Sequence, residues 1–457
     1  MPAREAGLER EQAPTQSRSE CGGARADMSA ARAEMVRGIG RWDLVALMCN
    51  ITIGSGILGL PAKLFGLTGV YSILALFLCA LLIAMVAVCF AEVGSRFRHT
   101  GGPYLFTRTA FGTGPGFIVG WLYWVSRVLA FATICNLLVG YVVRVLPALQ
   151  GPGPRLAIVS MVVIGIALVN LFGVRHATLL SNGLTTLKVS LLAVFGVVGI
   201  ATASAWPAMP ATPPPAGDFS DAMRLGIFAF VGFESALVSA GETRDPRRDI
   251  PFAVAMSLLA VVVLYAGVQI VCMATVPSLA TSTAPFADAA ATIWGARGEQ
   301  VVAVGAIVIM LGSLNSGFLA TSRLPFALAE HGDMPAVLSR LHPRFRTPHV
   351  AIISSAAVAW LATAANSFLS SITLATSTRV VVYIAGCMAL SVLRRRADVP
   401  PVGFTAPFGR TMAVLASMLS LALLTNASAR ELIQLAIAVG LGVGIYALRV
   451  GSDEQCR

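Results

Sequence analysis

Two short glycine-containing segments inside long apolar runs are the strongest candidates for a binding site. The first is Gly54-Ser55-Gly56 and the second is centred on Val231-Gly232. Each glycine disfavours a helix by about 1 kcal/mol relative to alanine, so a helix is weakest at these places. An unwound helix exposes N–H groups that can bind a carboxylate and carbonyl groups that can bind an ammonium. Together the two segments could therefore hold a zwitterion.

Two ionisable side chains accompany these segments. Lys188 is one of only two lysines among 33 basic residues. A buried lysine can lose its proton whereas arginine stays charged, so Lys188 is a candidate for coupling transport to protons or for holding the contact between spans one and five. The alternative is that its amine only extends to a polar interface. Glu234 is either functional itself or a structural partner of Arg127 or Arg379.

The elements that must position these residues are membrane helices. Of the 457 residues, 56% are hydrophobic and 12% are charged, which is about half the charged fraction of a typical soluble domain. The apolar runs of ~18–28 residues fit helices that cross the bilayer, and they lack the strict alternation of barrel strands. The net charge of +11 comes from arginines between these runs, which indicates a membrane surface and no nucleic-acid partner. The eight scattered cysteines predict neither a disulfide framework nor a metal site, and we expect no cofactor.

Twelve membrane spans are predicted after a disordered N-terminal tail, residues 1–40, which is too polar to bury a core. The spans are expected at residues 43–66, 68–94, 115–146, 155–172, 178–204, 219–240, 250–277, 287–327, 349–365, 371–393, 410–426 and 430–450. We expect residues 41–204 to form a first five-helix unit and residues 205–396 a second. Residues 397–450 then form helices 11 and 12, before a short tail at 451–457.

The distribution of basic residues orients these spans. An even number of spans places both termini on the same side of the membrane. Seventeen arginines fall on that side: Arg37, Arg41, Arg96, Arg98, Arg108, Arg175, Arg244, Arg247, Arg248, Arg340, Arg344, Arg346, Arg394, Arg395, Arg396, Arg410 and Arg449. Six basic residues fall on the other: Lys63, Arg144, Arg155, Arg224, Arg297 and Arg430. The positive-inside rule therefore predicts cytoplasmic termini, in a bacterial inner membrane.

The two glycine segments lie at the same expected depth in spans one and six. Gly54 is eleven residues from Asp43, which is about 16 Å along a helix and half of the hydrocarbon layer. Gly232 is about as far from the start of its own span. Because these spans enter from opposite sides, they match an inverted repeat whose discontinuous helices form a binding site. The alternative is that the glycines only permit close helix packing.

Several motifs follow one another along the chain: Gly54-Ser55-Gly56-Ile57, Glu92 to Phe97, Thr100 to Tyr104, Phe228 to Ala236, Gly241-Glu242, Asp245 to Pro251, and Ser322-Arg323 through to Pro348. In this order they resemble the motifs of the amino acid–polyamine–organocation superfamily of transporters, over nearly the whole chain after residue 40. The first motif departs from the family pattern, because Leu58 stands where a phenylalanine usually follows.

The resemblance implies an all-α polytopic membrane protein with a five-plus-five inverted repeat (LeuT-like), two extra helices and discontinuous helices one and six. The substrate would lie between spans one, three, six, eight and ten. Its carboxylate would meet Ile53, Gly54, Ser55, Gly56 and Ile57. Its amine would meet the segment Phe230, Val231, Gly232, Phe233 and Glu234, through the carbonyl groups of Phe230, Val231 and Phe233. Phe230 or Phe233 would gate the site, and Lys188 would stand where sodium-coupled relatives bind a cation.

Secondary active transport of amino acids is thus the predicted function. The first hypothesis is proton-coupled uptake of neutral or broad-range amino acids. The apolar residues Ile57, Phe230 and Phe233 favour an apolar side chain on the substrate. Exchange or export of amino acids or amines, including polyamines, is the runner-up, followed by a channel or a transporter-like nutrient sensor. The predicted spans carry no cluster of nucleophile, base or metal ligands and the sequence has no nucleotide-binding motif, which argues against an enzyme or an ATP-driven pump.

Overall fold

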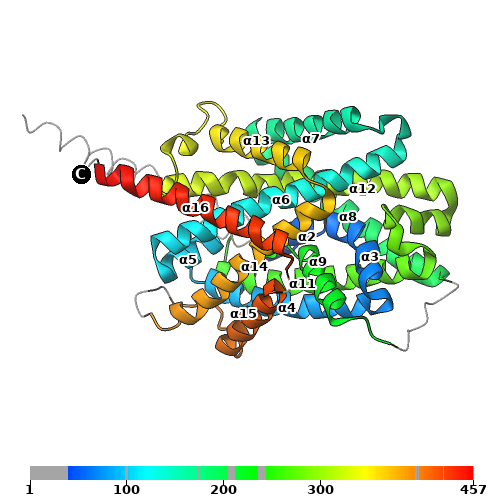
Figure 1. The fold of residues 1–457 in the computed structure, drawn as a ribbon, viewed down its shortest axis with the longest axis horizontal. Coiled ribbons are helices and arrows are strands. Elements are labelled where there is room, and N and C mark those ends of the chain that lie inside the picture. The colour runs from blue at the N-terminus through cyan, green and yellow to red at the C-terminus, as the bar shows by residue number, and fades with distance from the viewer. Residues whose placement is uncertain are drawn as a thin grey trace, which may run out of the picture.

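The computed structural model describes residues 40–97, 101–172, 174–203, 212–234, 243–396, 399, 401–425 and 427–455. Its main elements are α-helices that lie largely alongside one another (Figure 1). They are α2 (Arg41–Thr52), α3 (Ser55–Thr68), α4 (Ser72–Gly94), α5 (Pro103–Phe111), α6 (Thr113–Val145), α7 (Pro152–Phe172), α8 (Val174–Thr202), α9 (Ala216–Ala229), α11 (Pro246–Thr275), α12 (Pro285–Glu330), α13 (His349–Ala365), α14 (Phe368–Leu393), α15 (Gly409–Thr425) and α16 (Ala429–Gln455).

The described helices include eight segments that are long and apolar enough to cross a membrane, one of which joins α3 to α4, and two shorter apolar helices, α13 and α15. Large apolar side chains point outward from several of them. Met161 on α7 is 74% exposed and Val197 on α8 is 70% exposed. Such side chains face lipid at no cost, whereas they would be unfavourable over a whole water-facing surface. The predicted all-helical, multi-pass membrane protein is confirmed; the count of twelve spans stays a prediction.

The first predicted span, residues 43–66, is two helices in the structure, α2 and α3. The longest predicted span corresponds to α12, in which Gly295 leaves the helical conformation at φ 70° and divides the helix in two. Asp288 and Glu299, on either side of Gly295, both accept hydrogen bonds from Arg144 of α6, at 2.5 and 2.7 Å. Charges in an apolar helix are thus tolerated because one guanidinium pairs with both.

The short helix α5 has no counterpart among the predicted spans. Tyr104 and Arg108 of α5 meet Asp333, which follows α12, and both donate hydrogen bonds to its Oδ2 at 2.5 Å. Burial, and then the neighbouring Asp333, raise the pKa of the Tyr104 phenol. Arg449 of α16 donates to the other carboxylate oxygen of Asp333 at 3.1 Å. One buried carboxylate therefore connects three segments that are far apart in the chain.

Helix α6 packs against α12 and α14, while α3 packs on α9 and α2 on α8 and α11. In Figure 1, α6 crosses the middle of the helix bundle. Residues 1–39 of the expected tail lie outside the described residues, and α16 continues through Gln455 into the predicted C-terminal tail. The boundaries at 204, 396 and 450 stay predictions. These packing pairs surround the two glycine segments.

Candidate functional site

The first glycine segment interrupts a helix. Helix α2 ends at Thr52 and α3 begins at Ser55, and between them Ile53 (ψ 92°) and Gly54 (φ −137°, ψ −134°) are not helical. The first N–H groups of a helix have no partner inside it, and they form the positive end of the helix dipole. The start of α3, at Ser55 and Gly56, is therefore suited to bind an anion.

The second glycine segment ends α9 at Ala229. The N–H groups of Phe230 and Val231 turn back to the carbonyl groups three residues earlier, at 3.1 and 3.2 Å. Gly232 follows with φ +139°, a conformation that a residue with a Cβ rarely adopts. Its N–H group donates to the carboxylate of Glu234 at 3.1 Å. The glycine thus permits the turn and the carboxylate stabilises it.

The two interruptions lie directly against each other. A Cβ atom on Gly232 would come within 2.7 Å of Thr52 Oγ1 and 2.8 Å of Thr52 N. A Cβ atom on Gly56 would come within 2.8 Å of Ala229 Cα. Such distances are too short for any side chain, so these glycines also serve close packing. The glycine segments thus interrupt the helices and also allow them to pack closely.

A small cavity of about 40 Å³ lies beside the two interruptions. Its walls come from α2, α3, α6, α9, α12 and α14. The lining residues are Ile51, Thr52, Gly54, Ser55, Gly56, Arg127, Ala130, Phe131, Ile134, Phe228, Val231, Ser313, Leu314, Gly317, Thr321 and Arg379.

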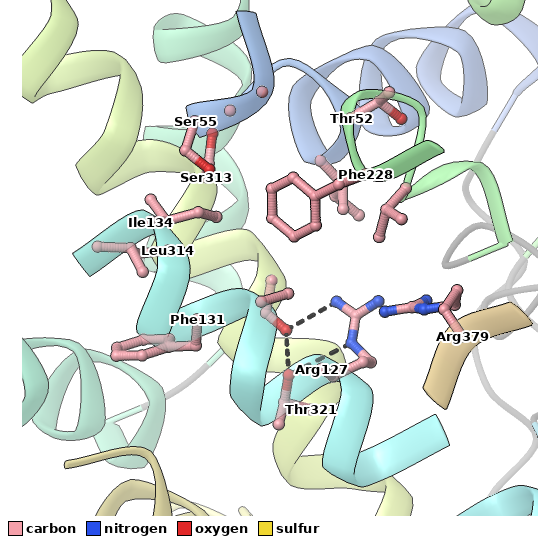
Figure 2. A pocket seen from close by; sticks show the side chains of 16 residues that line it. Thr52, Ser55, Arg127, Phe131, Ile134, Phe228, Ser313, Leu314, Thr321 and Arg379 are labelled. Atoms are coloured by element: carbon pink, nitrogen blue, oxygen red, sulfur yellow. Dashed lines mark hydrogen bonds between the residues drawn. The ribbon is translucent and has the colours of Figure 1, made fainter. Parts of the chain in front are cut away.

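The cavity has two polar ends. Figure 2 shows Ser55 and Ser313 at one end and the guanidinium groups of Arg127 and Arg379 side by side at the other, with the ring of Phe228 between them. The buried hydroxyl of Ser55 has no hydrogen-bond partner among the described residues. A buried polar group without a partner is costly, so this hydroxyl is available to a ligand. The apolar wall consists of Ala130, Phe131, Ile134 and Leu314.

The predicted binding residues divide into two groups. Gly54, Ser55, Gly56 and Val231 line the cavity; Ile53, Ile57, Phe230, Gly232, Phe233 and Glu234 do not.

Neither predicted gate borders the cavity. The Phe230 ring packs 5.6 Å from that of Tyr265, and the Phe233 ring lies 5.8 Å from that of Tyr383. From this segment it is Phe228 whose ring lines the cavity, a residue that the sequence motif contained without marking it.

The structure decides which arginine partners Glu234. The buried guanidinium of Arg379 on α14 forms an ion pair with the carboxylate through Nη1 and Oε1, and Tyr383 OH donates to Oε2 at 3.4 Å. Arg127 donates instead to Thr321 Oγ1 at 3.3 Å and to the Gly317 carbonyl at 2.9 Å. Glu234 therefore holds a cavity-lining arginine in place without lining the cavity itself.

Lys188 on α8 lies behind the first interruption. It is 1% exposed, so its amine does not extend to an interface. Its Nζ atom donates to Asn50 Oδ1 at 2.6 Å, Ser313 Oγ at 2.7 Å, Asn50 O at 3.0 Å and Ile53 O at 3.2 Å. The two carbonyl groups belong to the last turn of α2 and the residue after it, where helical acceptors lose their N–H partners. The ammonium thus replaces the hydrogen bonds that the interruption removes.

Comparison with known proteins identifies the family. The profile described as Amino acid permease matches residues 39–442, nearly nine-tenths of the chain. The chain belongs to the amino acid permease family. It is accordingly a multi-pass membrane transporter of small molecules and not an enzyme. The match includes both interruptions and all six cavity-forming helices.

Individual relatives of this permease differ in what their names say they carry. Cationic amino acid transporter 9, chloroplastic, of Arabidopsis thaliana is 28% identical over 68% of this chain, which spans 58% of that protein's length. Branched-chain amino acid permease BcaP of Bacillus subtilis is 24% identical over 90% of this chain and 92% of its own length. The methylthioribose transporter of the same organism is 24% identical over 69% of this chain and 72% of its own length.

Proposed function

We propose that this permease is a secondary active transporter whose uptake of amino acids is driven by a proton gradient. Family membership and relatives named for amino acid transport support the substrate class. The observation that carries the proposal is the cavity at the contact between two interrupted helices. The proposal includes twelve spans in two inverted five-helix units plus two more helices, with both termini in the cytoplasm of a bacterial inner membrane.

The cavity offers complementary groups to an amino acid. The carboxylate binds at the start of α3, where the Ser55 hydroxyl and the N–H groups of Ser55 and Gly56 are near the cavity. The ammonium binds toward the carbonyl end of α9, around Phe230 to Phe233, where Val231 lines the cavity. This assignment needs both interruptions, since an unbroken helix offers neither set of groups.

Lys188 is the proposed proton-coupling residue. Its acceptors are neutral oxygen atoms of α2, the residue after α2, and α12. A protonated amine donates to these oxygens and fixes α2 to α8 and α12. A neutral amine donates fewer hydrogen bonds and loosens that contact, so proton binding and movement of the first interrupted helix are linked.

Exchange or export of amino acids or amines is the second candidate, and a channel or sensor is more remote. The substrate preference for neutral or broad-range amino acids rested on Ile57, Phe230 and Phe233. Because those side chains do not line the cavity, they no longer support that preference.

Uptake into liposomes that contain the purified protein tests the function. We expect labelled amino acids to accumulate when the outside is more acidic than the inside, and accumulation to stop when a protonophore removes the gradient. Uptake that requires an amino acid on the opposite side, with or without the gradient, would establish an exchanger. Flux that does not saturate would indicate a channel, and absence of any amino acid flux would reject the proposal in favour of a sensor.

A further inference from the structure

The charged groups that face the cavity are cations. Among the sixteen lining residues the only charged side chains are Arg127 and Arg379, from α6 and α14. Glu234 pairs with Arg379 from outside the lining. This end of the cavity is thus lined by two guanidinium groups, one of which pairs with Glu234.

The two guanidinium groups share one aromatic ring. The Cζ atom of Arg379 lies 5.0 Å from the centre of the Tyr123 ring, and that of Arg127 lies 5.8 Å from it. Both side chains are at least nine-tenths buried, with exposed fractions of 6% for Arg127 and 1% for Arg379. Like charges this close in a low-dielectric environment repel each other, and an anion between them would relieve the repulsion.

Each end of the cavity has one buried polar atom without a hydrogen-bond partner among the described residues. At the arginine end, the buried Nε atom of Arg379 has no acceptor among the described residues. At the other end, the same holds for the buried hydroxyl of Ser55. The α-carboxylate of an amino acid can satisfy only one of these ends. A second acceptor group on the ligand would satisfy the other.

We propose that the transported amino acid is acidic, with its α-carboxylate at the start of α3 and its side-chain carboxylate between Arg127 and Arg379. This inference rests on the proposed function and names its substrate class. The methylene groups of such a side chain would pass Phe228 and the wall formed by Phe131 and Ile134 (Figure 2). A guanidinium donates two parallel hydrogen bonds to a carboxylate, which makes arginine well suited to this recognition.

A comparison of L-glutamate with L-glutamine tests the inference, because the two differ in charge and hardly in shape. Uptake of each, and of L-aspartate and L-leucine, is measured in the same liposomes. We expect the wild-type protein to prefer L-glutamate over L-glutamine by about tenfold or more, the effect of a charge-assisted bidentate contact. The Arg127→Gln variant should lose that preference, with uptake of L-glutamate falling by about tenfold relative to the wild-type protein.

Two control variants test whether a change in uptake is caused by misfolding. Arg340→Gln replaces an exposed arginine that does not line the cavity and should behave as wild type. Arg127→Lys keeps the charge without the bidentate geometry and should retain part of the preference for L-glutamate. Thermal unfolding and gel filtration verify each variant.

The outcomes separate this inference from the proposed function. Wild-type uptake of L-leucine or L-glutamine at least as efficient as that of L-glutamate would overturn the inference and leave amino acid transport established. Uptake of glutarate equal to that of L-glutamate would show an anion site without an ammonium site, which contradicts both. Uptake of no amino acid at all would refute the proposed function itself.

Discussion

The two helix interruptions are stabilised by charges of opposite sign. At the first, Lys188 donates to carbonyl groups at the end of α2. At the second, Glu234 accepts from the N–H group of Gly232. In both cases an ionic side chain supplies hydrogen bonds that a continuous helix would have made with its own backbone.

The surroundings of the two charges differ. Glu234 has a buried counter-ion in Arg379, whereas the hydrogen bonds of Lys188 go to neutral oxygen atoms. Neutralising Glu234 leaves a buried guanidinium without its carboxylate, which is costly. Neutralising Lys188 leaves no such ion behind. The comparison supports the proposal that the first interruption changes its charge during a transport cycle, while the second keeps its ion pair.

The largest effect is expected for Lys188→Ala. The variant should fold, because the lost ammonium leaves neutral oxygens, but it should lose accumulation of substrate driven by a proton gradient. Uptake into liposomes with an acidic exterior measures this. Lys188→Arg keeps a permanent charge, so it should also fail to couple, while Lys63→Ala, at the only other lysine, should accumulate substrate normally. Gradient-driven uptake by Lys188→Ala would assign the residue a structural role only.

Glu234→Gln comes next and probes the fixed charge. The amide still offers an oxygen to the N–H group of Gly232, so the substitution isolates the loss of the ion pair with Arg379. Removing one partner of a buried pair costs about 3–5 kcal/mol. We expect a marked fall in the thermal unfolding temperature, and a smaller fall for the double variant Glu234→Gln/Arg379→Gln. A single variant as stable as wild type would show that the second interruption does not depend on this charge.

A third variant, Gly232→Ala, tests whether contact between the interruptions matters more than the charges. The added Cβ atom meets Thr52 N at 2.8 Å and the residue must keep φ +139°. Overpacking alone costs about 1–3 kcal/mol. Lower stability and slower uptake are expected, while Gly440→Ala, where a Cβ atom has nothing within 4 Å, should change neither. Equal behaviour of the two variants would contradict the close contact.

The glycines in the sequence predicted where the helices break, whereas the packing of the helices against one another determines which side chains face the cavity. The interruptions at Gly54 and Gly232 follow from glycine itself. Which aromatic ring enters the cavity depends on helix rotation: Phe228 and Phe230 are two residues apart, which is about 200° around a helix, so one faces the cavity and the other Tyr265. Only the packing of α9 against its neighbours sets that rotation.

The arginines illustrate the same limit. Arg127 and Arg379 were the two expected partners for Glu234, and Arg379 is the one that forms the ion pair. That both line one cavity requires α6 and α14 to be adjacent, which no local pattern specifies. Helix α5 escaped prediction because its nine residues are too few for a span.

The smallest effect is expected for Ser313→Ala, which sharpens the comparison at the first interruption. The hydroxyl lies 2.7 Å from Lys188 Nζ and 2.9 Å from the carbonyl oxygen of Ile53, so it joins α12 to both. Its loss leaves Lys188 with the oxygens of Asn50 and Ile53 and removes about 1 kcal/mol, or about fivefold in proton-driven uptake. The buried Ser420 on α15, replaced in the same way, should have no such effect. If instead Ser313→Ala abolishes uptake altogether, the hydroxyl itself acts on the substrate, since it also lines the cavity opposite the arginines.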